Sequence, residues 1–105
     1  MIVTTTEYIP GREIEEILGI VKGNTIRARH LGSDIVAGFK NLVGGELKGY
    51  SKMITEARDE AYERMLHEAA SAGADAVINI RFTTSMIMTG ASEILAYGTA
   101  VKLKI

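Results

Sequence analysis

The chain has 105 residues, which is room for one domain, and a chain of this length buries roughly 65% of its unfolded surface on folding. We therefore expect a single domain over residues 1–105. Hydrophobic residues make up 47% of the chain and only one proline occurs, a composition far from that of a disordered protein. The 12 basic and 13 acidic residues are mixed along the chain, so no broad positive field exists to attract a nucleic acid.

The chain contains no cysteine, which excludes disulfides, thiolate metal ligands and cysteine nucleophiles together. Its first residues lack the basic lead and long apolar run of a signal peptide, and no segment approaches the ~20 apolar residues that span a bilayer. We expect a soluble, cytoplasmic protein with neither a membrane nor a nucleic acid as partner.

The first 29 residues favour strands. Residues 1–6 have the composition of a short strand at a sheet edge. Over residues 12–29 a second strand is expected, with Leu18 and Ile20 on one face and Val21 on the other. The glycines at positions 19 and 23 indicate bulges, or places where another backbone comes close.

Two helices are expected next. Ser33 or Asp34 can cap a short helix that ends at Gly44-Gly45. A long amphipathic helix follows from Ser51, the expected cap, to Gly73, the expected left-handed stop. The apolar stripe of the short helix comprises Ile35, Val36, Phe39, Leu42 and Val43, and that of the long helix comprises Ile54, Ala57, Ala61, Met65, Ala69 and Ala72.

The last third of the chain predicts a hairpin of two long strands, over residues 76–88 and 92–105, with a turn near Thr89-Gly90. Alternation places Ile78, Ile80 and Phe82 on one face of the first strand. In the second strand, Leu95, Tyr97, Thr99, Val101, Leu103 and Ile105 share one face, and Ile94, Ala96, Gly98 and Ala100 share the other.

The strands carry more apolar or small surface than one helix layer would need, so we expect a partner subunit to cover part of the sheet. The residues that suggest this excess are Ile14, Leu18, Ile20, Ala96, Gly98 and Ala100.

A set of short motifs gives the chain a family resemblance. These are MIVTTT at residues 1–6, Gly19-x-Val21-x-Gly23, Val43-Gly44-Gly45 followed by Gly49-Tyr50, Ala57-Arg58 with Ala61, GADAV at residues 73–77 and GTAV at residues 98–101. In this order and spacing they resemble the YbjQ-like family, whose domain is described as a "putative heavy-metal-binding domain", and the match spans essentially the whole chain.

The resemblance implies an α+β fold of the dodecin-like kind, with long twisted antiparallel strands packed with two helices. It also implies a ring oligomer, a homopentamer or decamer, so that the chain's partner is itself. It implies no established activity, and a transition-metal ion is the only cofactor it suggests.

Three groups of residues are candidates for chemistry. Glu63 and His67 stand at i and i+4 on the long helix, so a carboxylate and an imidazole can reach one cation, such as zinc or nickel, or can form an ordinary solvated pair. Met86 and Met88 would point to one side of their strand, where paired thioethers suit Cu(I) or Ag(I), or else fill core or interface space.

Glu68 projects within about 20° of the centre of the apolar stripe at ~100° per residue. A carboxylate in that position needs a partner, which Arg64, Arg58 or a subunit contact would supply. Alternatively, Glu68 is a general base in a pocket. His30 follows a strand and has no neighbours at metal-ligand spacing.

No nucleophile motif, phosphate loop or dinucleotide fingerprint is present, so the sequence gives little support to an enzyme. We expect an oligomeric binding or assembly protein that holds a metal ion or a small ligand at its subunit interfaces. A small enzyme with an interface base and a scaffold for a protein partner remain as alternatives.

Overall fold

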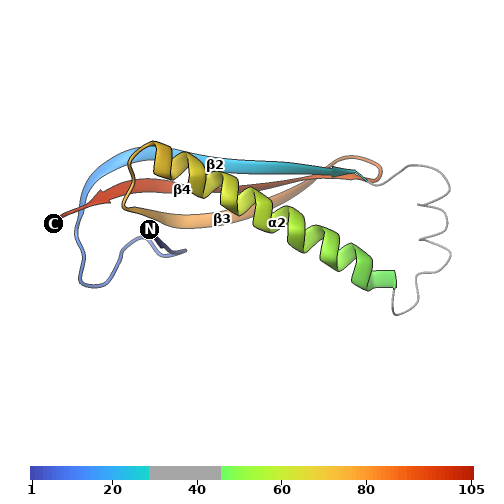
Figure 1. The fold of residues 1–105 in the computed structure, drawn as a ribbon, viewed down its shortest axis with the longest axis horizontal. Coiled ribbons are helices and arrows are strands. Elements are labelled where there is room, and N and C mark those ends of the chain that lie inside the picture. Colours follow the sequence, from blue (N-terminus) through green and yellow to red (C-terminus); the bar gives the residue numbers. More distant parts are fainter. Residues whose placement is uncertain (29–45) are drawn as a thin grey trace.

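The computed structural model describes residues 1–28 and 46–105, and in that part of the chain one long helix lies on one face of a four-stranded sheet (Figure 1). The short helix expected after Ser33 or Asp34, with its end at Gly44-Gly45, and His30 lie outside the described residues. The elements are β1 (Ile2–Val3), β2 (Ile14–Ala28), α2 (Glu46–Ser71), β3 (Ala76–Met88) and β4 (Ala91–Leu103).

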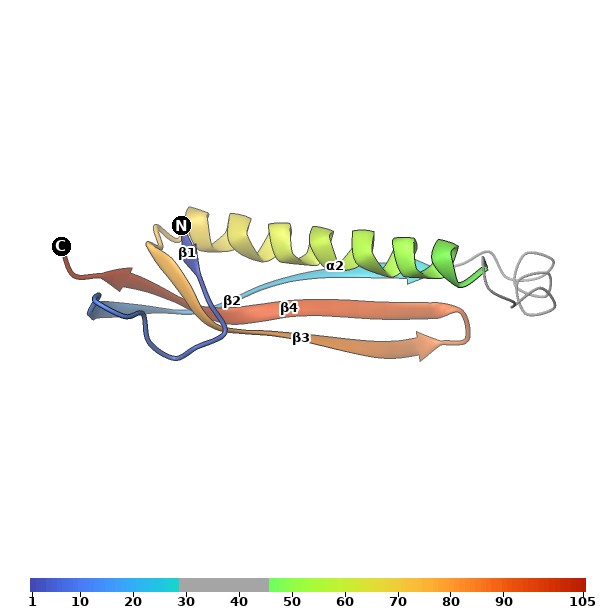
Figure 2. The same cartoon turned by 90° about the horizontal axis from the view of Figure 1, so that it is seen from below.

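The sheet has the strand order β1-β3-β4-β2. β4 is central and pairs antiparallel with both β2 and β3, while the short β1 pairs parallel with the beginning of β3. Figure 2 shows the long strands side by side with α2 running along them. The predicted hairpin is confirmed, because Thr89-Gly90 joins β3 to β4 and Gly90 adopts a φ of 80°. The α+β class and the short edge strand at the N-terminus are confirmed as well.

The predicted apolar stripe of the long helix is its packing face. Its central members, Ala57, Ala61, Met65 and Ala69, are all 0% exposed, whereas Ala72 is exposed and lies beyond the end of the helix. Alanine at these positions lets the helix axis approach the sheet closely.

The ends of α2 were predicted with unequal success. Ser51 is not the cap, because the helix already begins at Glu46, and Glu, Leu and Lys at positions 46–48 are good helix formers. Gly73 ends the helix as predicted, with a φ of 80°. The amides of Ala74 and Gly73 donate to the carbonyls of Ala69 and Ala70, which is the Schellman pattern.

The glycines of β2 have the two roles that the sequence suggested. Gly19 has a φ of 124° and lies at a register shift in the pairing with β4. Gly23 is where α2 touches the strand, since a Cβ there would lie 2.3 Å from the carbonyl oxygen of Ala61 and 2.4 Å from the amide nitrogen of Met65. The backbone of α2 therefore rests directly on β2.

Two bulges change the strand faces that simple alternation predicts. Asn79 has a φ of 53° and lies within a register shift of β3, so Ile78 and Ile80 pack in different clusters and do not share a face. The shift at Gly19 likewise places Leu18 against the main core together with Val21, where strict alternation had put them on opposite faces.

The faces of β4 follow the prediction. Ile94, Ala96 and Ala100 belong to the core cluster beneath α2, whereas Val101 and Leu103 belong to the second cluster. Ala96, Gly98 and Ala100 are therefore buried under the helix and do not need a second subunit to cover them.

The sheet face opposite α2 is covered at one end only. There Ile78, Val101 and Leu103 are buried, with Ile9 of the N-terminal segment packed against them. Further along the same face, Ile17 and Ile20 of β2 are 69% and 75% exposed. Part of the expected uncovered apolar strand surface is thus present, in β2.

Candidate functional site

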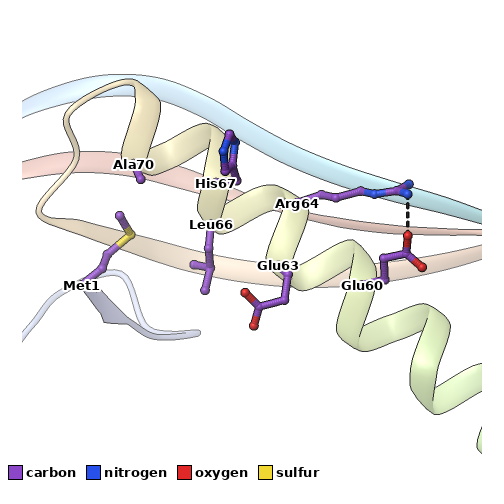
Figure 3. A pocket seen from close by; sticks show the side chains of 7 residues that line it. All are labelled: Met1, Glu60, Glu63, Arg64, Leu66, His67 and Ala70. Atoms are coloured by element: carbon purple, nitrogen blue, oxygen red, sulfur yellow. Dashed lines mark hydrogen bonds and ion pairs between the residues drawn. The ribbon is translucent and has the colours of Figure 1, made fainter.

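A hollow of about 570 Å³ runs along the second half of α2 and is the place where the predicted ligands Glu63 and His67 lie (Figure 3). Six of the seven lining residues belong to α2. The N-terminal Met1 closes one end next to Leu66. The lining residues are Met1, Glu60, Glu63, Arg64, Leu66, His67 and Ala70.

Glu63 and His67 share the hollow but do not converge within it. Both side chains are exposed, and in Figure 3 they point in different directions from the helix. The two residues lie one turn apart on the same helix, as their i, i+4 spacing predicts. Their side chains do not point toward one common position where both could bind the same cation.

The described residues do not complete a metal site around this pair. Residues 1–28 and 46–105 contain no group of three or more His, Cys, Asp or Glu side chains that could hold a metal ion. Zinc takes four ligands in structural sites and three protein ligands in catalytic ones, so two donors are insufficient. Any cation bound here needs further donors beyond the side chains of residues 1–28 and 46–105.

Met86 and Met88 lie near the tip of the β3–β4 hairpin and are 76% and 56% exposed. Met86 pairs with Ser92 and Met88 with Ala91, and a register shift separates the two pairs. Because Ser92 and Ala91 are consecutive residues of β4, their partners point to opposite faces of the sheet. The expectation that both thioethers point to one side is wrong, and the reason is the bulge at Ile87.

Glu68 is exposed and binds the main chain of a strand. One of its carboxylate oxygens accepts a hydrogen bond from the amide of Lys22 at 3.3 Å. The helix lies over β2 at the margin of the sheet, so a side chain near the middle of the apolar stripe reaches past the last strand to its free edge. Glu68 is not among the residues that line the hollow.

Arg64 does not pair with Glu68 as expected. Its guanidinium donates to the carbonyl of Asn24 at 2.6 Å and forms an ion pair with Glu60. Among the ion pairs of the described residues, Glu60 also binds Arg27 of β2. These contacts tie the outer side of α2 to β2.

The arrangement around Glu60 was missed by sequence reasoning. The hydrogen bond from Arg27 lowers the pKa of Glu60, partial desolvation opposes this, and the positive charges of Arg64 and Arg27 lower the pKa further. The i, i+4 spacing of Glu60 and Arg64 was a usable signal, whereas the approach of Arg27 depends on the tertiary fold.

The fold and the site define a class: a small α+β protein whose described part has one long helix on a four-stranded sheet and carries candidate ligands that do not complete a metal site among the described residues. Residues 1–104 match a family model of the YbjQ type described as "Putative heavy-metal-binding". The chain belongs to this family.

Relatives named UPF0145 protein extend the match. The chain is 61% identical over 104 residues to one from Archaeoglobus fulgidus, covering 99% of this chain and 96% of the relative. It is 62% identical to those from Psychromonas ingrahamii and Thermotoga maritima, covering 99% of this chain and 99% and 98% of the relatives. The family is therefore shared by archaeal and bacterial proteins.

The fold is similar to that of a protein of unknown function from Pediococcus pentosaceus, assigned to the DUF74 family. The TM-score is 0.67 and the sequence identity is 18%, with 99% of this chain and 98% of the other covered. In the described part of the chain, no helix combines the length and the apolar character needed to cross a membrane.

Proposed function

We propose that the protein is a subunit of a homo-oligomeric ring, a pentamer or a pair of pentamers, that holds a metal ion or a small ligand where subunits meet. The observation that carries the proposal is the apolar surface left open on the sheet. Ile17 and Ile20, at 69% and 75% exposure, lie on the face opposite α2. Burying an isoleucine side chain stabilises an assembly by about 1.5–3 kcal/mol, which favours a second chain over this face.

The ligand site is proposed at Glu63 and His67. Each chain offers one carboxylate and one imidazole, a donor set that suits zinc or nickel. A neighbouring copy would supply the remaining ligands, since the described residues of one chain offer no third donor beside this pair. The family description as heavy-metal-binding supports this choice of ligand.

The absence of cysteine also bears on the ligand and the compartment. Without thiolates, the site favours metals that accept nitrogen and oxygen donors. Without disulfides, the fold does not depend on an oxidising environment, and we propose that the assembly works in the cytoplasm.

Native mass spectrometry of protein purified without affinity-tag metal tests the assembly and the ligand together. The expected result is a mass of five or ten chains, with metal or another small mass in fixed proportion to the chains. Isothermal titration of metal-stripped protein with Zn(II), Ni(II), Cu(II) and Cu(I) should then show binding tighter than millimolar.

Two substitutions make the titration specific. His67→Ala should abolish tight binding, while Glu56→Gln removes an exposed carboxylate from the same helix outside the hollow and should leave it unchanged. An oligomeric ring that carries no adduct and binds none of these metals would contradict the proposed metal site. A monomer would contradict the proposed ring.

A further inference from the structure

The outer edge of β3 is paired over only part of its length. β1 occupies the beginning of the strand, where Ile2 and Val3 pair with Ala76 and Val77. The N-terminal segment continues this contact, and its last main-chain bonds to the strand run from the amides of Asn79 and Ile80 to the carbonyls of Thr6 and Thr4. Among the described residues, the strand pairs from Arg81 to Met88 with β4 on its inner side only.

The main-chain groups along this open edge can be assigned from the last outward bond. The amide of Ile80 points outward, because it donates to Thr4. Outward groups recur at every second residue of an antiparallel strand, so Phe82, Thr84 and Met86 present their amides and carbonyls away from β4. Three residues with unpaired groups at this spacing form a template for another strand.

The side chains of the open edge lack the devices that usually block such pairing. Residues 82–88 read FTTSMIM, with no charge, no proline and no glycine. Every residue from Arg81 to Gly90 is exposed, including Phe82 at 44%, Met86 at 76% and Ile87 at 54%. Exposed edges of natural proteins are normally protected by lysine, proline or a covering element.

We propose that β3 pairs antiparallel with β3 of a second copy about a two-fold axis at Ser85, so that Thr84 and Met86 of one chain pair with Met86 and Thr84 of the other. The proposal rests on the proposed oligomer and specifies one of its interfaces. In a five-fold assembly, this pairing joins two rings into ten chains, because each chain of one ring pairs with one chain of the other.

A second copy fits this edge for three reasons. The uncharged segment meets itself without repulsion between like charges. Both open edges are closed by one contact, whereas an unrelated peptide would leave its own outer edge unpaired. The added strands also cover apolar side chains such as Met86 and Ile87, which single chains leave in water.

Cross-linking provides a direct test because the chain contains no cysteine. In the proposed register, Ser85 faces Ser85 of the second copy at the Cα separation typical of a non-hydrogen-bonded pair, about 4.5 Å, which allows a disulfide. Ser85→Cys should therefore run as a covalent dimer after mild oxidation. Ser51→Cys, which places a cysteine at an exposed position of α2, should remain single.

Proline provides a second and independent test. Thr84→Pro removes an outward amide while the ladder with β4 keeps its donors, so the mass of the assembly should fall to half. Thr84→Val keeps the amide and should leave the mass unchanged. Circular dichroism and the thermal midpoint show whether the proline variant is folded, and the cysteine test stands without it.

The outcomes separate this inference from the proposed function. A wild-type oligomer whose Ser85→Cys variant does not cross-link overturns the two-fold pairing, whatever Thr84→Pro does, and leaves the ring intact. An oligomer that keeps its mass in a folded Thr84→Pro variant overturns it as well. A wild-type monomer overturns both proposals.

Discussion

The two strands that flank the central strand β4, β2 and β3, have opposite surroundings. α2 packs mainly on β2 and β4 and barely contacts β3. At β2 the helix also reaches over the edge, where Glu68 accepts from the amide of Lys22 and Arg64 donates to the carbonyl of Asn24. At β3 no side chain of α2 forms such a bond among the described residues, although Tyr62 stacks on Phe82 with ring centroids 6.4 Å apart.

The difference shows how one helix can close one edge of a sheet and leave the other available. The closing side chains lie on α2 within one turn of Met65, whose backbone rests on Gly23. Close contact at a single glycine thus brings a carboxylate and a guanidinium within reach of the strand edge. Among the described residues, β3 has no equivalent contact with α2. The main-chain groups at its outer edge therefore stay available to another strand.

The largest expected effect follows from filling the space at Gly23. In Gly23→Ala the new methyl group would meet main-chain atoms of Ala61 and Met65 at 2.3 and 2.4 Å, so the helix must move away from β2. We expect the free energy of unfolding to fall by about 3 kcal/mol, the upper range for overpacking, measured by urea denaturation.

The matched control is Lys22→Ala, which changes an exposed side chain on the adjacent residue and should alter stability by less than about 0.5 kcal/mol. The amide of Lys22, and with it the bond to Glu68, is retained in this control. Equal stability of Gly23→Ala and wild type would mean that α2 does not rest on β2 at this point.

Features that depend on local periodicity could be predicted from the sequence. The stripe from Ala57 to Ala69 identified the buried face of α2, because alanine and methionine recur every three or four residues. Gly73 marked the end of the helix, and Thr89-Gly90 marked the hairpin. Each of these signals lies within a few residues of the feature that it predicts.

Features that depend on a distant segment could not be predicted. The bulge at Asn79 has two consecutive amides, of Asn79 and Ile80, that both donate to the N-terminal segment. This pairing places Ile78 on the sheet face opposite α2. The period-two pattern of β3 alone does not predict this change of face. A pattern of period two holds only while the ladder is regular, so one inserted residue reverses every later assignment.

The candidate site likewise has some features that the sequence predicted and some that depend on the tertiary fold. Spacing placed Glu63 and His67 on one helix, and the structure brings both into one hollow. The presence of Met1 beside them depends on the pairing of β1 with β3. Glu68 was expected to need a partner, either an arginine or a subunit contact, and within this chain the amide of Lys22 donates a hydrogen bond to it.

An intermediate effect is expected from opening the closed edge. Glu68→Ala removes the acceptor for the amide of Lys22, so this amide should exchange with solvent about fivefold faster, in proportion to the loss of a bond of about 1 kcal/mol. Hydrogen exchange followed by NMR measures it directly. The substitution makes the edge of β2 more like that of β3.

Two variants sharpen this prediction. Glu68→Gln keeps an oxygen acceptor and should restore most of the protection, while Glu63→Ala removes a carboxylate from the same helix that does not reach the strand edge. Lys22 exchange that is the same in Glu68→Ala and in wild type would show that the carboxylate does not protect this edge.

The smallest effect concerns the pH dependence of the contact between Glu60 and Arg27. The hydrogen bond from Arg27 lowers the pKa of Glu60 below its ordinary value of 4.5, so the carboxyl group of Glu60 binds fewer protons in the folded chain than in the unfolded one near that pH. The stabilisation is therefore complete above about pH 4.5 and is lost as the pH falls through the lowered folded pKa.

Urea denaturation of wild type and Glu60→Gln at pH 7, 5 and 3 measures this loss. The difference in the free energy of unfolding between the two proteins should be the same at pH 7 and 5 and should shrink at pH 3. Glu56→Gln, one turn earlier on α2, corrects for the loss of a negative charge. A difference that stays constant down to pH 3 would mean that the ionised carboxylate of Glu60 does not hold α2 to β2, leaving Gly23 and the edge contacts of Glu68 and Arg64 to distinguish the two sides of the sheet.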